Sequence, residues 1–103
     1  MSEVPKKVIL MGKKWVLYIL RCKDDTLYTG ITDDLERRLA AHRAGKGAKY
    51  TRGRGPLILE YVEKCDDRSH ALKRELAVKA MPRAEKLELC QSYVENEDRE
   101  EQT

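Results

Sequence analysis

The sequence predicts an α/β domain of the α+β type, in which a small three-stranded antiparallel sheet is flanked by helices in the order β-β-α-β-α-α. Three observations predict this class. Two short apolar segments rich in β-branched and aromatic residues, 15–22 and 26–32, are joined by the polar turn KDDT, as in a β-hairpin. A third such segment, 57–64, lies between two stretches with helical periodicity. At 103 residues, the chain has about the length of one domain.

The hairpin formed by WVLYILRC and TLYTGIT carries one tyrosine on each strand, Tyr18 and Tyr28. Residues that face each other across a hairpin share a side of the sheet, and side chains alternate with a period of two. A two-residue loop would therefore put the tyrosines on opposite faces. A three-residue loop, residues 24–26, would pair Lys23 with Leu27 and put both tyrosines on one face. The pattern leaves both registers open.

The segment DDLERRLAAHRAG, residues 33–45, predicts the first helix. Asp33 and Glu36 have the spacing of a capping box, and Gly45 is a typical helix stop. Two polar side chains share a helix face with two leucines, although an arginine can keep its guanidinium wet and a histidine can simply favour a helix C-terminus. The residues of this face, at the spacing i, i+3, i+4 and i+7, are Leu35, Arg38, Leu39 and His42.

A strongly basic segment, residues 37–54, covers the end of this helix and the loop that follows, where a helical turn is expected near residues 49–52. The whole chain has a net charge of only +3, whereas this segment has seven basic residues and no acidic one. Positive charge is therefore concentrated in this segment. A patch without interspersed acids is the electrostatic signature of a protein that binds a phosphate backbone. Its cations are Arg37, Arg38, Arg43, Lys46, Lys49, Arg52 and Arg54.

The second long helix is predicted over residues 66–81, with an aspartate cap at its start and a stop at Pro82. Glu75 lies within its apolar face. Because an unpaired buried carboxylate is costly, Glu75 either pairs with Lys79 one turn later or lines a polar cleft. The apolar face itself runs through Ala71, Leu72, Leu76 and Val78.

The ends of the chain and its cysteines complete the organisation. We expect an N-terminal extension over residues 1–13, an ordered domain over 14–94 that ends in a helix starting near Pro82, and an acidic disordered tail over 95–103. No apolar run approaches the ~20 residues of a membrane span or forms a signal-peptide core, so the chain is expected to be cytoplasmic without membrane contact. The cysteines lack CxxC spacing, which favours free thiols over disulfides or structural zinc: Cys22, Cys65 and Cys90.

Five side chains predicted to face inward could together hydrolyse a phosphodiester, although each has an ordinary structural interpretation when taken singly. A carboxylate can hold Mg²⁺ or Mn²⁺, and an arginine can bind a phosphate through two hydrogen bonds. A tyrosine can accept a proton from water if nearby cations lower its pKa from ~10. Only one of the carboxylates lies on a predicted inner face, which favours one metal ion over two. The five are Tyr18, Tyr28, Arg38, His42 and Glu75.

These residues resemble the GIY-YIG endonuclease superfamily. Its two signature tripeptides correspond to residues 16–18 (VLY) and 28–30 (YTG), its helix arginine matches Arg38, and its late metal-binding glutamate matches Glu75. The resemblance extends over about residues 15–89. The stretch HRAGKGAKYTRGRGPL is especially similar to the small single-domain bacterial YhbQ-like group and to the nuclease domain of the Slx-type resolvases.

The resemblance implies a three-stranded antiparallel sheet with surrounding helices, and single-metal hydrolysis of DNA with Mg²⁺ or Mn²⁺. Structured or branched DNA of repair or recombination is the substrate that it suggests, and RNA is not excluded. It implies that Tyr28 acts as base or positions the nucleophile, with Tyr18 as its hydrogen-bonding partner. Arg38 would stabilise charge in the transition state, and Glu75 would hold the metal.

Two further roles follow from the same resemblance. His42 would be an alternative base or a phosphate contact, and Gly30 would permit close approach of the nucleic acid to the backbone. Together with Gly30, the contacts to nucleic acid would come from the basic segment: Arg43, Lys46, Lys49, Arg52 and Arg54. Two other functions fit the sequence: a nucleic-acid-binding module without turnover, or a nuclease subunit that a protein partner targets through the last helix or the tail.

Overall fold

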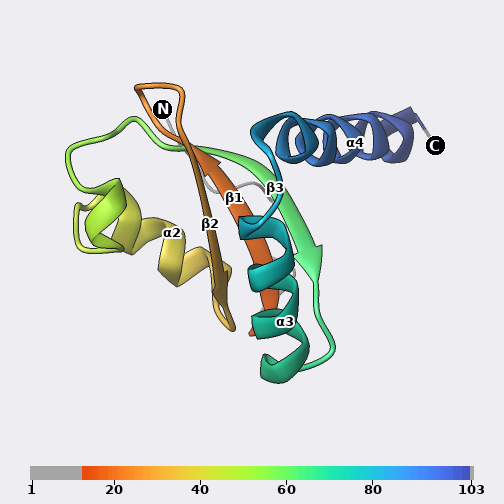
Figure 1. Ribbon diagram of the computed structural model, residues 1–103, viewed down its shortest axis with the longest axis horizontal. Helices are drawn as coiled ribbons and strands as arrows, with labels where there is room; N and C mark the ends of the chain where they lie inside the picture. The colour runs from red at the N-terminus through yellow and green to blue at the C-terminus, as the bar shows by residue number, and fades with distance from the viewer. Residues whose placement is uncertain (1–12, 103) are drawn as a thin grey trace.

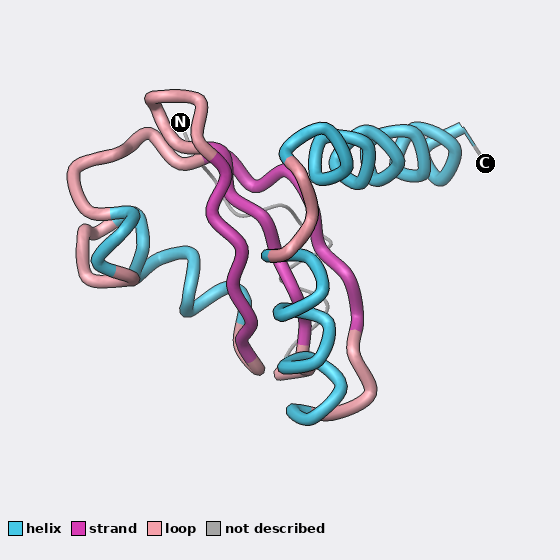
Figure 2. The backbone as a smooth tube through the Cα atoms, in the orientation of Figure 1, coloured by secondary structure: helices cyan, strands magenta, loops and turns pink. Residues whose placement is uncertain are grey.

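The sheet has the strand order β2-β1-β3, with antiparallel neighbours and helices on both faces, which confirms the predicted fold class (Figures 1 and 2). The computed structural model describes residues 13–102, so the predicted extension lies outside the described residues except for its last one. The elements, in the predicted order, are β1 (Val16–Arg21), β2 (Leu27–Thr32), α2 (Leu35–Arg43), the 3₁₀ turn η1 (Lys49–Thr51), β3 (Ile58–Lys64), α3 (Arg68–Lys79) and α4 (Arg83–Gln102).

The hairpin loop has three residues, but it lies one residue earlier than the predicted three-residue alternative. The backbone N–H of Cys22 donates to the carbonyl of Thr26 at 2.9 Å, and the N–H of Asp25 donates to the carbonyl of Cys22 at 2.9 Å. Asp25 has φ of 69°, a left-handed conformation that aspartate tolerates. A tight turn followed by one left-handed residue is the usual three-residue hairpin connection.

This register puts both tyrosines on one face of the sheet. Tyr18 pairs with Gly30, and Leu20 pairs with Tyr28. Since paired residues share a side and alternate residues of a strand share a side, Tyr18 and Tyr28 are diagonal neighbours.

The core consists of two clusters, one on each face of β1. The central strand is buried on both sides, which explains its nearly continuous apolar run. Leu35 and Leu39 of α2 cover the face that carries Tyr18, together with Leu57. Residues of α3 and α4 cover the opposite face. That second cluster contains Leu17, Ile19, Tyr61, Val78 and Cys90. Figure 1 shows β2 at the edge of the sheet, between α2 and α3.

Helix α2 begins one residue later than predicted, so the capping box of Asp33 and Glu36 is wrong. The cap is Asp34, whose carboxylate accepts the N–H of Arg37 at 3.2 Å. The hydroxyl of Thr32 accepts the N–H of Asp34 at 3.1 Å and so fixes the chain at this later entry point. The predicted stop at Gly45 is confirmed, since this residue has φ of 75° just after the helix.

Helix α3 has the predicted aspartate cap, Asp67, but only half of the predicted apolar face is buried. Ala71 and Val78 are buried, whereas Leu72 is 38% exposed and Leu76 is 71% exposed. Between Ala71 and Val78, the half-buried side chains are Arg74 and Glu75 instead of the two leucines. Arg74 donates from Nε to the Glu63 carboxylate of β3 at 2.6 Å.

Helix α4 continues to Gln102, so residues 95–102, which the sequence predicts as a disordered tail, are helical. Glutamate, arginine and glutamine have high intrinsic helix propensity, and a preceding helix supplies the costly nucleus. The three cysteines are free thiols, as predicted. Among the helices of residues 13–102, none is both long and apolar enough to cross a bilayer.

The corrected cap leads to a prediction about stability. Replacing Asp34 by alanine removes an acceptor from the first turn of α2 and should lower the free energy of unfolding by about 1 kcal/mol. Asp33→Ala is the matched control and should change it by less than about 0.5 kcal/mol. Urea unfolding followed by circular dichroism measures both, and a larger loss for Asp33→Ala would restore the cap at that position.

Candidate active site

Three polar side chains meet on the face of the sheet that α2 covers. The phenol oxygen of Tyr18, a fully buried residue, lies 2.8 Å from Nε2 of His42. Arg38 Nε donates to the same phenol oxygen at 3.4 Å. Arg38 and His42 are one turn apart on α2, which is why both reach a single residue of β1. The polar residues on the inner face of this helix therefore have partners there.

The hydrogen bonds around His42 fix its tautomer. The hydroxyl of Thr51 donates to the carbonyl of Ala48 at 2.9 Å, so its oxygen must accept from Nδ1–H of His42 at 2.8 Å. A neutral imidazole protonated at Nδ1 has an unprotonated Nε2. Nε2 therefore accepts the O–H of Tyr18, and Arg38 donates to that oxygen. The result is one chain of hydrogen bonds in which each group donates to the next. It runs from Arg38 through Tyr18, His42 and Thr51 to the backbone carbonyl of Ala48.

Burial sets the protonation of this chain at neutral pH. It lowers the pKa of His42 to about 4, and the charge of Arg38 acts in the same direction. Burial also raises the pKa of Tyr18 well above its usual value, and this outweighs the hydrogen bond from Arg38. The expectation that nearby cations lower a tyrosine pKa is therefore wrong for Tyr18. His42 is neutral, and Tyr18 keeps its proton.

Tyr28 connects the buried chain of hydrogen bonds with the surface. Its ring is half-buried and lies edge-on to His42, with ring centroids 5.3 Å apart, and it lies 6.2 Å from the ring of Tyr18. It also stacks on Tyr50 of η1 at 5.9 Å. Tyr50 is exposed, so the stacked rings of Tyr50 and Tyr28 extend from the protein surface to His42.

Two glycines make room for these side chains. A Cβ atom at Gly30 would lie 2.6 Å from the phenol oxygen of Tyr18 and 3.0 Å from the ring of Tyr28. Gly30 is itself buried, so the close approach that it permits is that of the two phenols. A Cβ at Gly47 would lie 2.4 Å from Nδ1 of His42, so this residue also has to be glycine for the ring to fit. Sequence analysis missed Gly47, although its GKG context lies just after the helix.

The basic loop is attached to the site rather than free. Besides the Thr51 contact, the guanidinium of Arg54 lies over the ring of Tyr50, 4.5 Å from its centroid, and forms an ion pair with Asp24 of the hairpin. Arg54 and Arg43 are half-buried. The exposed cations predicted to contact nucleic acid are Lys46, Lys49 and Arg52. Thr51 and Tyr50 were not predicted as site residues, because nothing in a loop sequence indicates which side chains turn inward.

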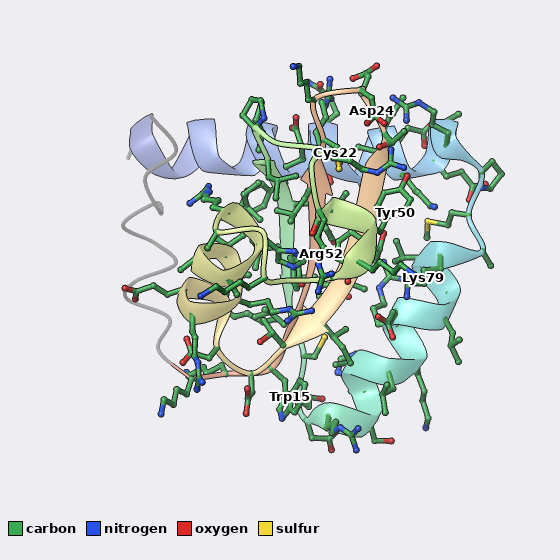
Figure 3. The ribbon with its side chains drawn as sticks, turned by 90° about the vertical axis from the view of Figure 1, so that its left-hand side faces the viewer. Trp15, Cys22, Asp24, Tyr50, Arg52 and Lys79 are labelled. Atoms are coloured by element: carbon green, nitrogen blue, oxygen red, sulfur yellow. The ribbon has the colours of Figure 1, made fainter. Side chains whose placement is uncertain are left out.

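Glu75 forms the ion pair with Lys79 that the sequence left open, at 3.2 Å, and its side chain is 19% exposed. Arg74, the preceding residue, contacts Glu63 of β3, whereas Lys79 lies beside residues of β2. Lys79 itself lines a hollow of about 270 Å³ together with Tyr28 and Tyr50. In Figure 3, Tyr50 and Lys79 lie close together at the edge of β2. Of the two alternatives, Glu75 therefore takes the ion pair: the residues that line this hollow include Lys79 but not Glu75.

The acidic and metal-binding side chains allow only a simple metal site. Across the described residues, His, Cys, Asp and Glu side chains do not gather in groups of three or more. Mg²⁺ is often held by one or two carboxylates, with the rest of its ligands from water and substrate phosphates. Glu75 could supply one such carboxylate, because it is only partly buried, but a metal ion there would have to displace the ammonium of Lys79.

Comparisons with known proteins agree with this architecture. The chain is 52% identical over 81 residues to a UPF0213 protein of Oceanobacillus iheyensis, which covers 79% of this chain and 94% of that protein. It is 54% identical over 83 residues to a UPF0213 protein of Lactiplantibacillus plantarum, covering 79% and 82%.

Two solved structures have the same fold. The solution NMR structure of a UPF0213 protein from Bacillus halodurans superposes with a TM-score of 0.51 at 44% identity, covering 76% of this chain and 83% of that one. The solution NMR structure of the protein EF2693 from E. faecalis gives a TM-score of 0.56 at 40% identity, covering 79% and 86%. Residues 14–88 match the family model of the GIY-YIG catalytic domain. The chain therefore belongs to the GIY-YIG family, among small proteins of the UPF0213 type.

Proposed function

We propose that this protein is a metal-dependent endonuclease that hydrolyses DNA phosphodiester bonds. The observation that carries the proposal is the directed chain of hydrogen bonds from Arg38 through Tyr18 to His42, with Tyr28 packed against it. In this arrangement a neutral histidine accepts from a phenol that an arginine also contacts, so the network has an unprotonated nitrogen toward which a proton can move. Membership in a family of catalytic domains supports the same conclusion.

Proton transfer in this network has one direction. Arginine has only donors, so the proton of Tyr18 can move only toward Nε2 of His42, which already accepts it in a hydrogen bond. Tyr28, the more accessible phenol, orients the attacking water. As the water oxygen bonds to phosphorus, its proton passes through the phenols to His42, and the bond from phosphorus to the leaving oxygen breaks.

Charge on the phosphoryl group is met from two sides. Arg38 donates from Nε to Tyr18 and also lines a polar hollow of about 360 Å³. The other N–H groups of its guanidinium can bind a phosphate oxygen there. Glu75 would hold Mg²⁺ or Mn²⁺, which, when bound, polarises a phosphoryl oxygen and stabilises the leaving alkoxide. Lys79, which now pairs with Glu75, would then become available to phosphate.

One observation favours a second function, a nucleic-acid-binding module without turnover. The Glu75 carboxylate is occupied by Lys79, and the exposed Lys46, Lys49 and Arg52 can bind a phosphate backbone without any chemistry. Structured DNA remains our proposed substrate, and a nuclease subunit that a protein partner targets remains a separate alternative. The cleavage assay below separates turnover from binding.

Cleavage should depend on the two residues that face the reacting phosphate. Purified protein is incubated with single-stranded, duplex, flap and branched DNA in Mg²⁺ or Mn²⁺, with chelator as the blank. Tyr28→Phe and Glu75→Gln should each reduce the rate by about 10²-fold or more, because positioning and charge stabilisation are lost. Lys73→Gln, on the outer face of α3, should cleave at the wild-type rate. Undiminished cleavage by Glu75→Gln would mean that the site is misassigned.

The depressed pKa of His42 predicts acid sensitivity. Between pH 6.5 and about 4 the unfolded chain binds a proton at this histidine and the folded chain does not. Stability should therefore fall as the pH drops through this window, by about 1–3 kcal/mol from this residue. Urea unfolding across the window should show a steeper pH dependence for wild type than for His42→Gln. Equal slopes would contradict the assignment.

Thr51 should act as a positioning residue for His42. Thr51→Val keeps the shape but leaves Nδ1–H buried without an acceptor, which costs about 1–3 kcal/mol or shifts the proton to Nε2. We expect the ¹⁵N spectrum of the His42 ring to show the changed tautomer, and cleavage to fall at least about tenfold. Thr51→Ser should restore both. An unchanged ring spectrum in Thr51→Val would show that this hydrogen bond does not set the tautomer.

A further inference from the structure

A hollow of about 270 Å³ lies at the free edge of β2, close to where α3 ends and α4 begins. Four elements contribute to it, so it is a feature of the tertiary structure and not of one helix. Its lining residues are Leu27, Tyr28, Thr29, Tyr50, Lys79 and Lys86. Figure 3 labels two of these residues, Tyr50 and Lys79, which lie close together beside β2.

The charge of this hollow favours an anion. Its lining residues include two lysines and no carboxylate, although Lys79 also pairs with Glu75 beside the hollow. By contrast, the hollow that Arg37 and Arg38 line, where β2 ends and α2 begins, also has Asp33 and Asp34 in its wall. A lysine ammonium on a flexible stem is a common phosphate ligand, acting as a point charge. Of the two hollows, only the one with Lys79 and Lys86 has no carboxylate among its lining residues, and Lys86 is the cation there that no ion pair of the described residues neutralises.

A buried hydroxyl gives a second, independent indication. Thr29 lines the same hollow, is 4% exposed, and its Oγ1 has no hydrogen-bond partner within the described chain. Buried hydroxyls in proteins nearly always have a partner. A phosphate oxygen that entered the hollow would offer one after rotation of the threonine side chain.

Position relative to the reacting groups then identifies the ligand. Tyr28 belongs both to the wall of this hollow and to the cluster around His42, so an anion here would be the immediate neighbour of the phosphate that is cut. We propose that the hollow with Lys79 and Lys86 binds the nucleic-acid backbone phosphate adjacent to the scissile one. The position of this phosphate next to the cleaved bond rests on the proposed function. Binding of a backbone phosphate at Lys86 does not depend on cleavage.

The experiment measures binding without turnover. A short fluorescein-labelled DNA, as single strand and as duplex, is titrated with protein in chelator between about 50 and 200 mM salt. Lys86→Gln should lower the slope of log K against log salt by about 0.7 for the single strand or 0.9 for the duplex, which is one phosphate contact. Lys73→Gln, an exposed lysine on the outer face of α3, is the matched control and should leave the slope unchanged. Lys79→Gln is measured in a Glu75→Gln background, so that no unpaired carboxylate is created.

The contact is then located along the strand. DNAs with a single neutral methylphosphonate linkage at successive positions are titrated with wild type and with Lys86→Gln. One linkage, next to the bond that the wild type cleaves, should weaken binding by wild type but not by Lys86→Gln, because the variant has already lost that contact. A salt slope for Lys86→Gln equal to that of Lys73→Gln overturns the subsite, even if cleavage is observed. A reduced slope without cleavage of any DNA keeps the phosphate site and overturns the nuclease.

Discussion

The site depends on the buried imidazole of His42, which is held at both nitrogens. Tyr18 donates to one nitrogen and Thr51 accepts from the other, so one ring joins the central strand, helix α2 and the basic loop. The ring also fits there only because residue 47 is glycine, since a Cβ atom at this position would lie 2.4 Å from Nδ1. A buried polar network in which every member has its partner is rigid, and here the rigidity has a chemical result. It fixes which nitrogen can accept a proton.

Much of the fold could be predicted from the sequence because each element carries its own local signal. The apolar strands, the helix periods and the left-handed stop at Gly45 depend only on neighbours along the chain. The same periodicity placed Arg38 and His42 on the inner face of α2 correctly. The cap failed by one residue because Thr32, outside the helix, selects Asp34 over Asp33. That choice depends on a side chain which no helix pattern includes.

The site residues that sequence analysis missed belong to tertiary contacts. Tyr50 and Thr51 lie in a loop, where no period tells which side chain turns inward, and their partners are distant in sequence. The predicted face of α3 was partly wrong in a related way: Arg74, and not Leu76, lies toward β3, where it pairs with Glu63, and Leu76 is exposed. A pattern of apolar residues cannot anticipate a polar contact that overrides it.

The bond between His42 and Thr51 also has a consequence for how this chain can vary in length. The two residues are 9 positions apart, and the segment between them must turn back tightly enough for Oγ1 to reach Nδ1. Surface loops usually absorb insertions at little energetic cost. This loop cannot, since one added residue would either displace the hydroxyl from the ring or push Gly47 away from it. The number of residues between the helix and the 3₁₀ turn is therefore as much a determinant of the active site as the identity of the side chains.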